Sequence, residues 1–304
     1  MIETRPLEGV IPVLQTPLAA DRSIDVAAIA RHIDFLVGKG VGGLWVLGTG
    51  SEDMNLSFVK RLEVARAATK ANAGRVPLIL GAGFFCMEDS LAFMDQTQDL
   101  EFDAYHVMPY HPLLSLSRLD WCYRKLAGAA QAPLWMYTSA NWARAITPEF
   151  IAGLREHPNI AGIKFSTQRT SDMLKVIEMA QRGFQVITAV AVQWVVCLSM
   201  GVKAGTTSLA GALPEPLIEI YDLFRAGEHE KALAAQHRLN AFLESLPKGA
   251  KSDNFLTGAE EKYILKLRGI CEPYMTDYYR ELDEGEQRQL EQTLDAFAML
   301  EKAA

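Results

Sequence analysis

The stretch Ile160-Ala-Gly-Ile-Lys-Phe-Ser166 has the length and the apolar, β-branched character of a buried β-strand. Side chains alternate between two faces along a strand, so Gly162, Lys164 and Ser166 share one face. Burial disfavours the charged form of an amine, which makes a lysine in such a run unusual. The stretch therefore predicts a strand that carries one ionisable side chain on a buried face.

Seven other short apolar runs resemble this one, and they are spaced by roughly a strand plus a helix. The eight predicted strands cover residues 9–18, 43–48, 77–83, 104–110, 133–138, 160–166, 184–190 and 203–210.

The segments between these runs have helical periodicity. In the first, apolar residues occur at positions 26, 29, 33 and 36, Ser23 or Asp25 can cap the start, and Gly38 and Gly40 end it. The same pattern predicts helices over residues 87–100, 117–130, 147–156 and 170–182.

Eight β–α units over about 220 residues predict an α/β fold of the (β/α)8 TIM-barrel type, and they favour it over an open doubly wound sheet. After Pro214 the pattern is helical only, over 217–225, 228–246, 259–267 and 284–300. The last three of these helical segments are additional to the helices of a (β/α)8 barrel. We therefore expect a barrel with the active site in residues 1–226 and a C-terminal helical extension in 227–304, packed on the barrel or on a neighbouring subunit.

Composition narrows the class of partner. The 304 residues are 49% hydrophobic and carry a formal net charge of −7, which argues against nucleic acid or an anionic membrane surface. The four cysteines (86, 122, 197 and 271) lack metal-ligand or redox spacing, so we expect them to be reduced. No signal peptide or membrane span is evident, and we expect a soluble, cytoplasmic protein.

Lys164 is the strongest candidate for catalysis. Loss of hydration lowers the pKa of a buried lysine and leaves part of the amine neutral and nucleophilic. A neutral amine condenses with a ketone or an aldehyde to give a Schiff base. The alternative is a structural lysine that reaches water or pairs with a carboxylate.

Active sites of such barrels lie at the carboxyl ends of the strands, which limits the other candidates. The turn Thr49-Gly50-Ser51 offers N–H and hydroxyl donors that suit a carboxylate, although such turns are common. Tyr137 could shuttle protons beside the amine, or it could be a buried tyrosine with a satisfied hydroxyl. His111 could be an acid/base or a supporting donor, or simply exposed.

For Glu52 and Asp53, which follow the donor turn, we expect a capping or pairing role. No His/Asp/Glu set has metal-ligand spacing, no Gly-rich loop matches a nucleotide site, and no Gly-x-Ser-x-Gly elbow occurs. We therefore expect no metal and no cofactor.

Several motifs together resemble the dihydrodipicolinate synthase / N-acetylneuraminate lyase family, in order and over essentially the whole chain. They are Gly48-Thr-Gly-Ser-Glu52, Tyr137, Gly162-Ile-Lys164, Ala204-Gly-Thr-Thr-Ser-Leu-Ala210 and Pro214-Glu215.

The resemblance implies a class I, pyruvate-dependent aldolase barrel, usually a homotetramer. It implies that Lys164 forms a Schiff base with pyruvate or another 2-oxo acid and that Tyr137 is the proton shuttle. Thr49 and Gly50 would cradle the substrate carboxylate, and Thr207 would lie near the imine.

The chain also departs from the family pattern. Gly50 stands where the family turn has a second threonine, and His111 stands where the synthase branch has a second tyrosine. Ala-Val-Ala at 189–191 replaces the acidic pair after the seventh strand. These differences argue against a true dihydrodipicolinate synthase and against a sialic acid lyase. Together with the aromatic residues at 84, 85 and 142, they suggest a less polar pocket.

The leading hypothesis is a Schiff-base lyase of the aldolase type that acts on a small 2-oxo acid. A 2-oxo (sugar) acid dehydratase or deaminase that uses the same imine is the alternative. A non-catalytic barrel that binds 2-oxo acids is the third possibility.

Overall fold

The computed structural model describes residues 5–138, 143–181, 183–254, 256 and 258–300. Eight parallel strands form one sheet in the order β1-β8-β7-β6-β5-β4-β3-β2. The strands are β1 (Gly9–Pro12), β2 (Leu44–Val46), β3 (Leu78–Gly81), β4 (Ala104–Val107), β5 (Leu134–Tyr137), β6 (Ile160–Phe165), β7 (Gln185–Thr188) and β8 (Ala204–Thr207).

The sheet closes between its first two strands just beyond the end of β1. Val13 bridges to Trp45 in parallel, and the Leu14 amide donates to the Trp45 carbonyl at 3.0 Å. This closure confirms the predicted (β/α)8 barrel, with strands at all eight predicted places but shorter than the apolar runs.

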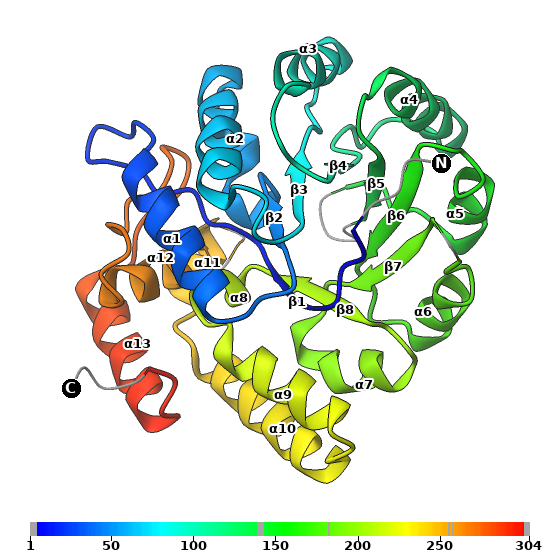
Figure 1. The fold of residues 1–304 in the computed structure, drawn as a ribbon. Coiled ribbons are helices and arrows are strands. Elements are labelled where there is room, and N and C mark those ends of the chain that lie inside the picture. The colour runs from blue at the N-terminus through cyan, green and yellow to red at the C-terminus, as the bar shows by residue number, and fades with distance from the viewer. Residues whose placement is uncertain (1–4, 139–142, 182, 255, 257, 301–304) are drawn as a thin grey trace.

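Helices surround the barrel (Figure 1). They are α1 (Val26–Gly38), α2 (Phe58–Asn72), α3 (Met87–Thr97), α4 (Leu116–Ala129), α5 (Pro148–Leu154), α6 (Thr170–Ile177), α7 (Trp194–Ser199), α8 (Leu209–Ala212) and α9 (Glu215–Arg225). Asp25, not Ser23, caps α1 by accepting from the Ala28 amide.

The apolar pattern did not reveal α2, because much of its buried face is small or polar, including Arg61, Ala65, Ala68 and Asn72. Such a helix lacks the apolar stripe on which periodicity depends.

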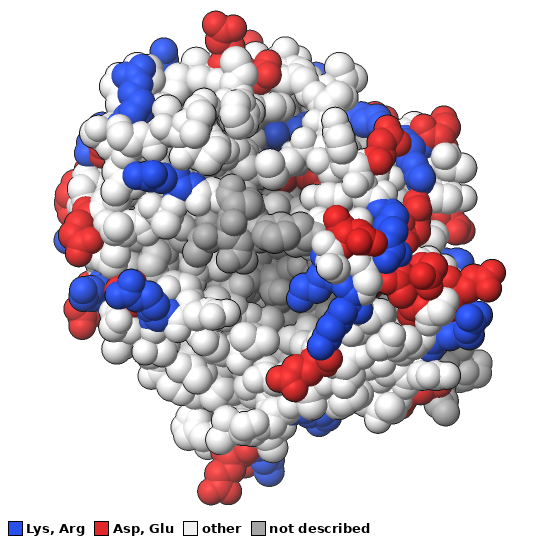
Figure 2. Space-filling model, turned by 180° about the vertical axis from the view of Figure 1, so that it is seen from behind, with Lys and Arg blue, Asp and Glu red and all other residues white. Residues whose placement is uncertain are grey.

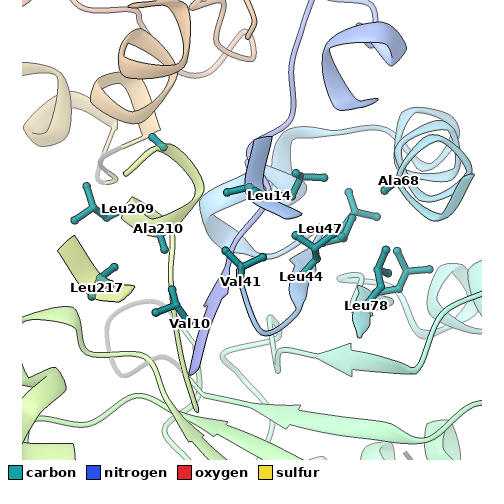
Figure 3. Close-up of a cluster of buried hydrophobic side chains, with 14 of the residues drawn as sticks. Val10, Leu14, Val41, Leu44, Leu47, Ala68, Leu78, Leu209, Ala210 and Leu217 are labelled. Atoms are coloured by element: carbon teal, nitrogen blue, oxygen red, sulfur yellow. The ribbon is translucent and has the colours of Figure 1, made fainter. Parts of the chain in front are cut away.

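Two hydrophobic layers flank the strands. The larger lies between strands and helices, where Val10, Leu44 and Leu78 meet side chains from the surrounding elements (Figure 3). The smaller fills the barrel interior and includes Trp45 and Trp135.

Strand β6 separates these two layers as the alternation predicted. Ile163 and Phe165 belong to the outer layer. A Cβ on Gly162 would lie 2.8 Å from the Trp135 ring, so Gly162 faces the interior, and Lys164 faces it too, beside Tyr137.

The C-terminal helices are α10 (His229–Ser245), α11 (Gly249–Asn254), α12 (Gly258–Leu267) and α13 (Glu284–Ala296). Helix α10 lies along α9, and its Gln236 side chain accepts from the Val195 amide and donates to the Ala191 carbonyl. The predicted helical extension is therefore present, and it packs on the barrel of its own chain.

Charged side chains of both signs are scattered over the face shown in Figure 2, without an extended patch of one sign. Among the described residues, no helix combines the length and apolarity that crossing a membrane requires.

Candidate active site

The carboxyl ends of the strands surround a cavity of about 130 Å³. Its lining comes from the strand ends and from the extension. The lining residues are Val13, Thr49, Gly50, Tyr137, Thr138, Lys164, Ser166, Ala189, Thr206, Thr207, Ser208, Leu256 and Gly258.

Lys164 is the charged side chain in this lining, and it is 5% exposed. Its Nζ lies 3.8 Å from the ring centre of Tyr137 and 5.4 Å from that of Trp45. Burial lowers the pKa of Lys164 to about 7, although the Asp53 carboxylate acts in the opposite direction. A substantial share of the amine is therefore neutral near pH 7, as a nucleophilic lysine requires.

Tyr137 lies at the end of β5, opposite Lys164 in the register of the two strands. Its hydroxyl is 3.1 Å from the Thr49 hydroxyl, and either can donate. Burial raises the pKa of Tyr137 above that of a free phenol, so the hydroxyl keeps its proton at neutral pH. The arrangement places a proton donor beside an amine.

The donor turn forms a short 3-10 helix, η1 (Thr49–Ser51), and Glu52 after it adopts the left-handed conformation (φ 59°). Thr49 and Gly50 face the cavity. The Ser51 hydroxyl instead donates to the Leu14 carbonyl at 2.5 Å, and Ser51 does not line the cavity.

The C-terminal extension contacts this turn through Glu52. Lys262 of α12 forms a buried ion pair with Glu52 at 2.6 Å. The Thr276 amide and hydroxyl both donate to the other Glu52 oxygen at 2.8 Å. Glu52 therefore has the pairing role that we expected.

A neighbouring residue of α12 binds the end of β1 beside the cavity. Glu261 accepts from the Gln15 amide group at 2.9 Å, and the same nitrogen donates to the Ser208 carbonyl at 2.7 Å. Two consecutive residues of the extension thus hold the two turns that flank the cavity.

Asp53 belongs to a buried group beside the cavity. It accepts from the Tyr110 hydroxyl at 2.5 Å, and one of its oxygens is 3.9 Å from Arg61. Arg61 also donates to the carbonyls of Gly81 and Gly83 and stacks on Phe84. Desolvation raises the pKa of Asp53, while Arg61 opposes that shift. This network was not apparent in the sequence, because Asp53 follows β2, Tyr110 follows β4 and Arg61 lies on helix α2.

Two expectations for the pocket are not met by the geometry. His111 does not line the cavity; its ring stacks on the exposed ring of Phe85 at 4.8 Å. Phe84 packs on Phe58 and Phe93 in the outer layer.

Of the Ala-Val-Ala stretch, only Ala189 lines the cavity. Trp142 lies outside the described residues. The cavity is richer in hydroxyl groups than the sequence suggested. Besides the predicted Thr49, Tyr137 and Thr207, its lining includes Thr138, Ser166, Thr206 and Ser208. These four residues lie at or just after predicted strand ends, and that position was the feature of the sequence that could have identified them.

A closed barrel of parallel strands with its cavity at their carboxyl ends places the protein in the (β/α)8 barrel class. Residues 6–297 match the model of the Dihydrodipicolinate synthetase family, so the chain belongs to that family. The names of the family and of the relatives below identify it as a lyase.

Curated relatives include the 4-hydroxy-tetrahydrodipicolinate synthase of Salinibacter ruber, 32% identical over 79% of this chain and 82% of the relative. A probable 2-dehydro-3-deoxy-D-pentonate aldolase of Escherichia coli is 27% identical, and the match covers 80% of this chain and 81% of that relative.

A prophage protein of the dihydrodipicolinic acid synthase family from Escherichia coli K12, solved in complex with pyruvate, superposes with a TM-score of 0.88 at 23% identity. The match covers 96% of this chain and 99% of that one, and at this identity it shows the shared fold.

Proposed function

We propose that this lyase acts on pyruvate or another 2-oxo acid through a Schiff base on Lys164, as a class I aldolase. The observation that carries the proposal is the buried amine with a pKa of about 7, next to a tyrosine that keeps its proton. Relatives named as an aldolase and as a synthase of the same family support it.

In this mechanism the neutral Lys164 amine attacks the C2 carbonyl to give a carbinolamine. Tyr137 donates its proton to the departing hydroxide, which leaves as water, and an iminium forms. The resulting tyrosinate removes the proton from the C4 hydroxyl of a bound 4-hydroxy-2-oxo acid, the C3–C4 bond breaks into an aldehyde and an enamine, and the iminium accepts the electron pair. Tyr137 then returns this proton to C3 of the enamine. Water hydrolyses the resulting iminium to pyruvate and the free Lys164 amine, and the released proton returns to Tyr137. Thr49 holds the phenol in place through its hydrogen bond.

A dehydratase or deaminase would use the same iminium and expel water or an amine. Product analysis separates the two reactions, because aldol cleavage releases an aldehyde whereas dehydration preserves the carbon count. The hydroxyl-rich cavity suits either substrate.

The test is borohydride reduction in the presence of pyruvate, followed by peptide mass mapping. We expect an adduct on the peptide that contains Lys164 and none in Lys164→Ala. Lys203→Ala, which removes an exposed lysine beside β8, is the matched control and should label normally. No adduct with pyruvate or with longer 2-oxo acids would reject the imine mechanism and favour a non-catalytic binding protein.

A further inference from the structure

Gly50 and Ser208 share the space of one side chain. A Cβ built on Gly50 would lie 2.5 Å from the Ser208 Cβ, which is closer than real Cβ atoms approach one another. The glycine at position 50 is therefore required by the presence of Ser208, which reaches the donor turn from the end of β8.

Two hydrogen bonds to its carbonyl hold the backbone of Ser208. Its carbonyl accepts from Gln15 at 2.7 Å and from the Gly211 amide at 2.9 Å. Ser208 lines the cavity together with Thr49 and Lys164. Among the described residues, none forms a hydrogen bond with the Ser208 hydroxyl. Such a hydroxyl can donate to a ligand without giving up a bond inside the protein.

The ligand that this hydroxyl suits is an anion. A 2-oxo acid bound through its C2 carbon to Lys164 places a carboxylate next to that carbon, and the carboxylate needs donors to replace lost water. Thr49 and Gly50 lie on one side of the cavity, and Ser208 is in contact with Gly50.

We propose that the Ser208 hydroxyl donates a hydrogen bond to the carboxylate of the 2-oxo acid, from the space that a side chain at position 50 would otherwise fill. This inference rests on the proposed function. It assigns a substrate-binding residue at the end of β8 and makes positions 50 and 208 alternative sites for one hydroxyl.

The first experiment measures the pyruvate concentration that gives half-maximal borohydride labelling of Lys164. Removing a hydrogen bond to a charged group predicts a roughly 10- to 100-fold increase in Ser208→Ala. The maximal labelling should be unchanged, because the amine is intact. Ser171→Ala, an exposed serine of α6, is the control and should match the unaltered protein.

The second experiment moves the hydroxyl. Gly50→Ser alone should lower both thermal stability and labelling through its clash with Ser208. Ser208→Gly should fold but require more pyruvate. The double variant Gly50→Ser/Ser208→Gly should recover most of the loss, with circular dichroism melts to verify folding. If Ser208 had only a structural role, its substitution would not change the pyruvate concentration for half-maximal labelling without also changing the maximal labelling.

Unchanged half-saturation in a folded Ser208→Ala, or a double variant no better than Ser208→Gly, would overturn the inference. Failure of the proposed function looks different, because the unaltered protein would then give no adduct at any pyruvate concentration. Calorimetric titration of Lys164→Ala with pyruvate, with and without Ser208→Ala, tests the carboxylate contact without an imine. Equal affinities there would also contradict the inference.

Discussion

Asp53 is the charged group that opposes the lowering of the Lys164 pKa. Its carboxylate favours the ammonium form, so Asp53→Asn should move the pKa of Lys164 below 7. The neutral amine then appears at lower pH, and the rise of cyanoborohydride trapping with pH should shift to lower pH. Asparagine still accepts from the Tyr110 hydroxyl, which preserves the local geometry.

The exposed Asp99 provides a control, since Asp99→Asn should leave the pH profile of trapping where it is. A profile for Asp53→Asn that stays in place or shifts to higher pH would show that Asp53 does not act on the amine.

Tyr137 should matter for proton transfer more than for binding. In Tyr137→Phe, exchange of the methyl protons of pyruvate for deuterium, which requires the enamine, should slow by about 10²- to 10⁴-fold. Proton NMR in D2O measures this exchange without knowledge of the natural aldehyde. Tyr221→Phe on α9 should exchange at the normal rate, and an equally fast Tyr137→Phe would assign the shuttle to another group.

Helix α12 secures the donor turn through the ion pair between Lys262 and Glu52, both nearly inaccessible to solvent. Lys262→Met leaves the Glu52 carboxylate buried without its cation and should lower the free energy of unfolding by about 3–5 kcal/mol. Urea denaturation measures this change.

Lys266→Met, on an exposed part of the same helix, should have a small effect on unfolding. Glu52→Gln combined with Lys262→Met should be less destabilised than Lys262→Met alone, since no charge then remains unpaired. Additive losses would mean that the pair does not interact as the distance indicates.

The barrel and the extension should unfold as one unit. Glu52 and Gln15 of the barrel bind α12 and Thr276, and Gln236 binds the segment around α7. All five tryptophans precede residue 227, so their fluorescence reports the barrel, whereas far-UV circular dichroism also reports α10–α13. The two denaturation curves should coincide; two separated transitions would support independent domains divided near residue 226.

Assembly into a homo-oligomer, a tetramer by the family resemblance, remains a prediction. Sedimentation velocity on the purified chain would measure it, and a monomer at micromolar concentration would contradict it.

Local sequence determined the strands and most of the helices of this protein, although not α2. The alternation in residues 160–166 predicted both the strand and the face on which Lys164 lies, because a period of two admits only two faces. The strand ends also indicated which residues could meet at the active site, since parallel strands of a barrel present their carboxyl ends together.

The tertiary structure decided which of these residues meet. It turned Ser51 toward Leu14 and His111 toward Phe85, and it brought Ser208 against Gly50 from a distant part of the chain. It also placed Asp53 with Tyr110 and Arg61, and Glu52 with Lys262. Such contacts depend on how strands and helices far apart in the sequence pack against one another. Local periodicity does not encode which of these distant residues come into contact. The sequence thus specified the strands and the lysine, whereas packing set the lysine's pKa and its neighbours.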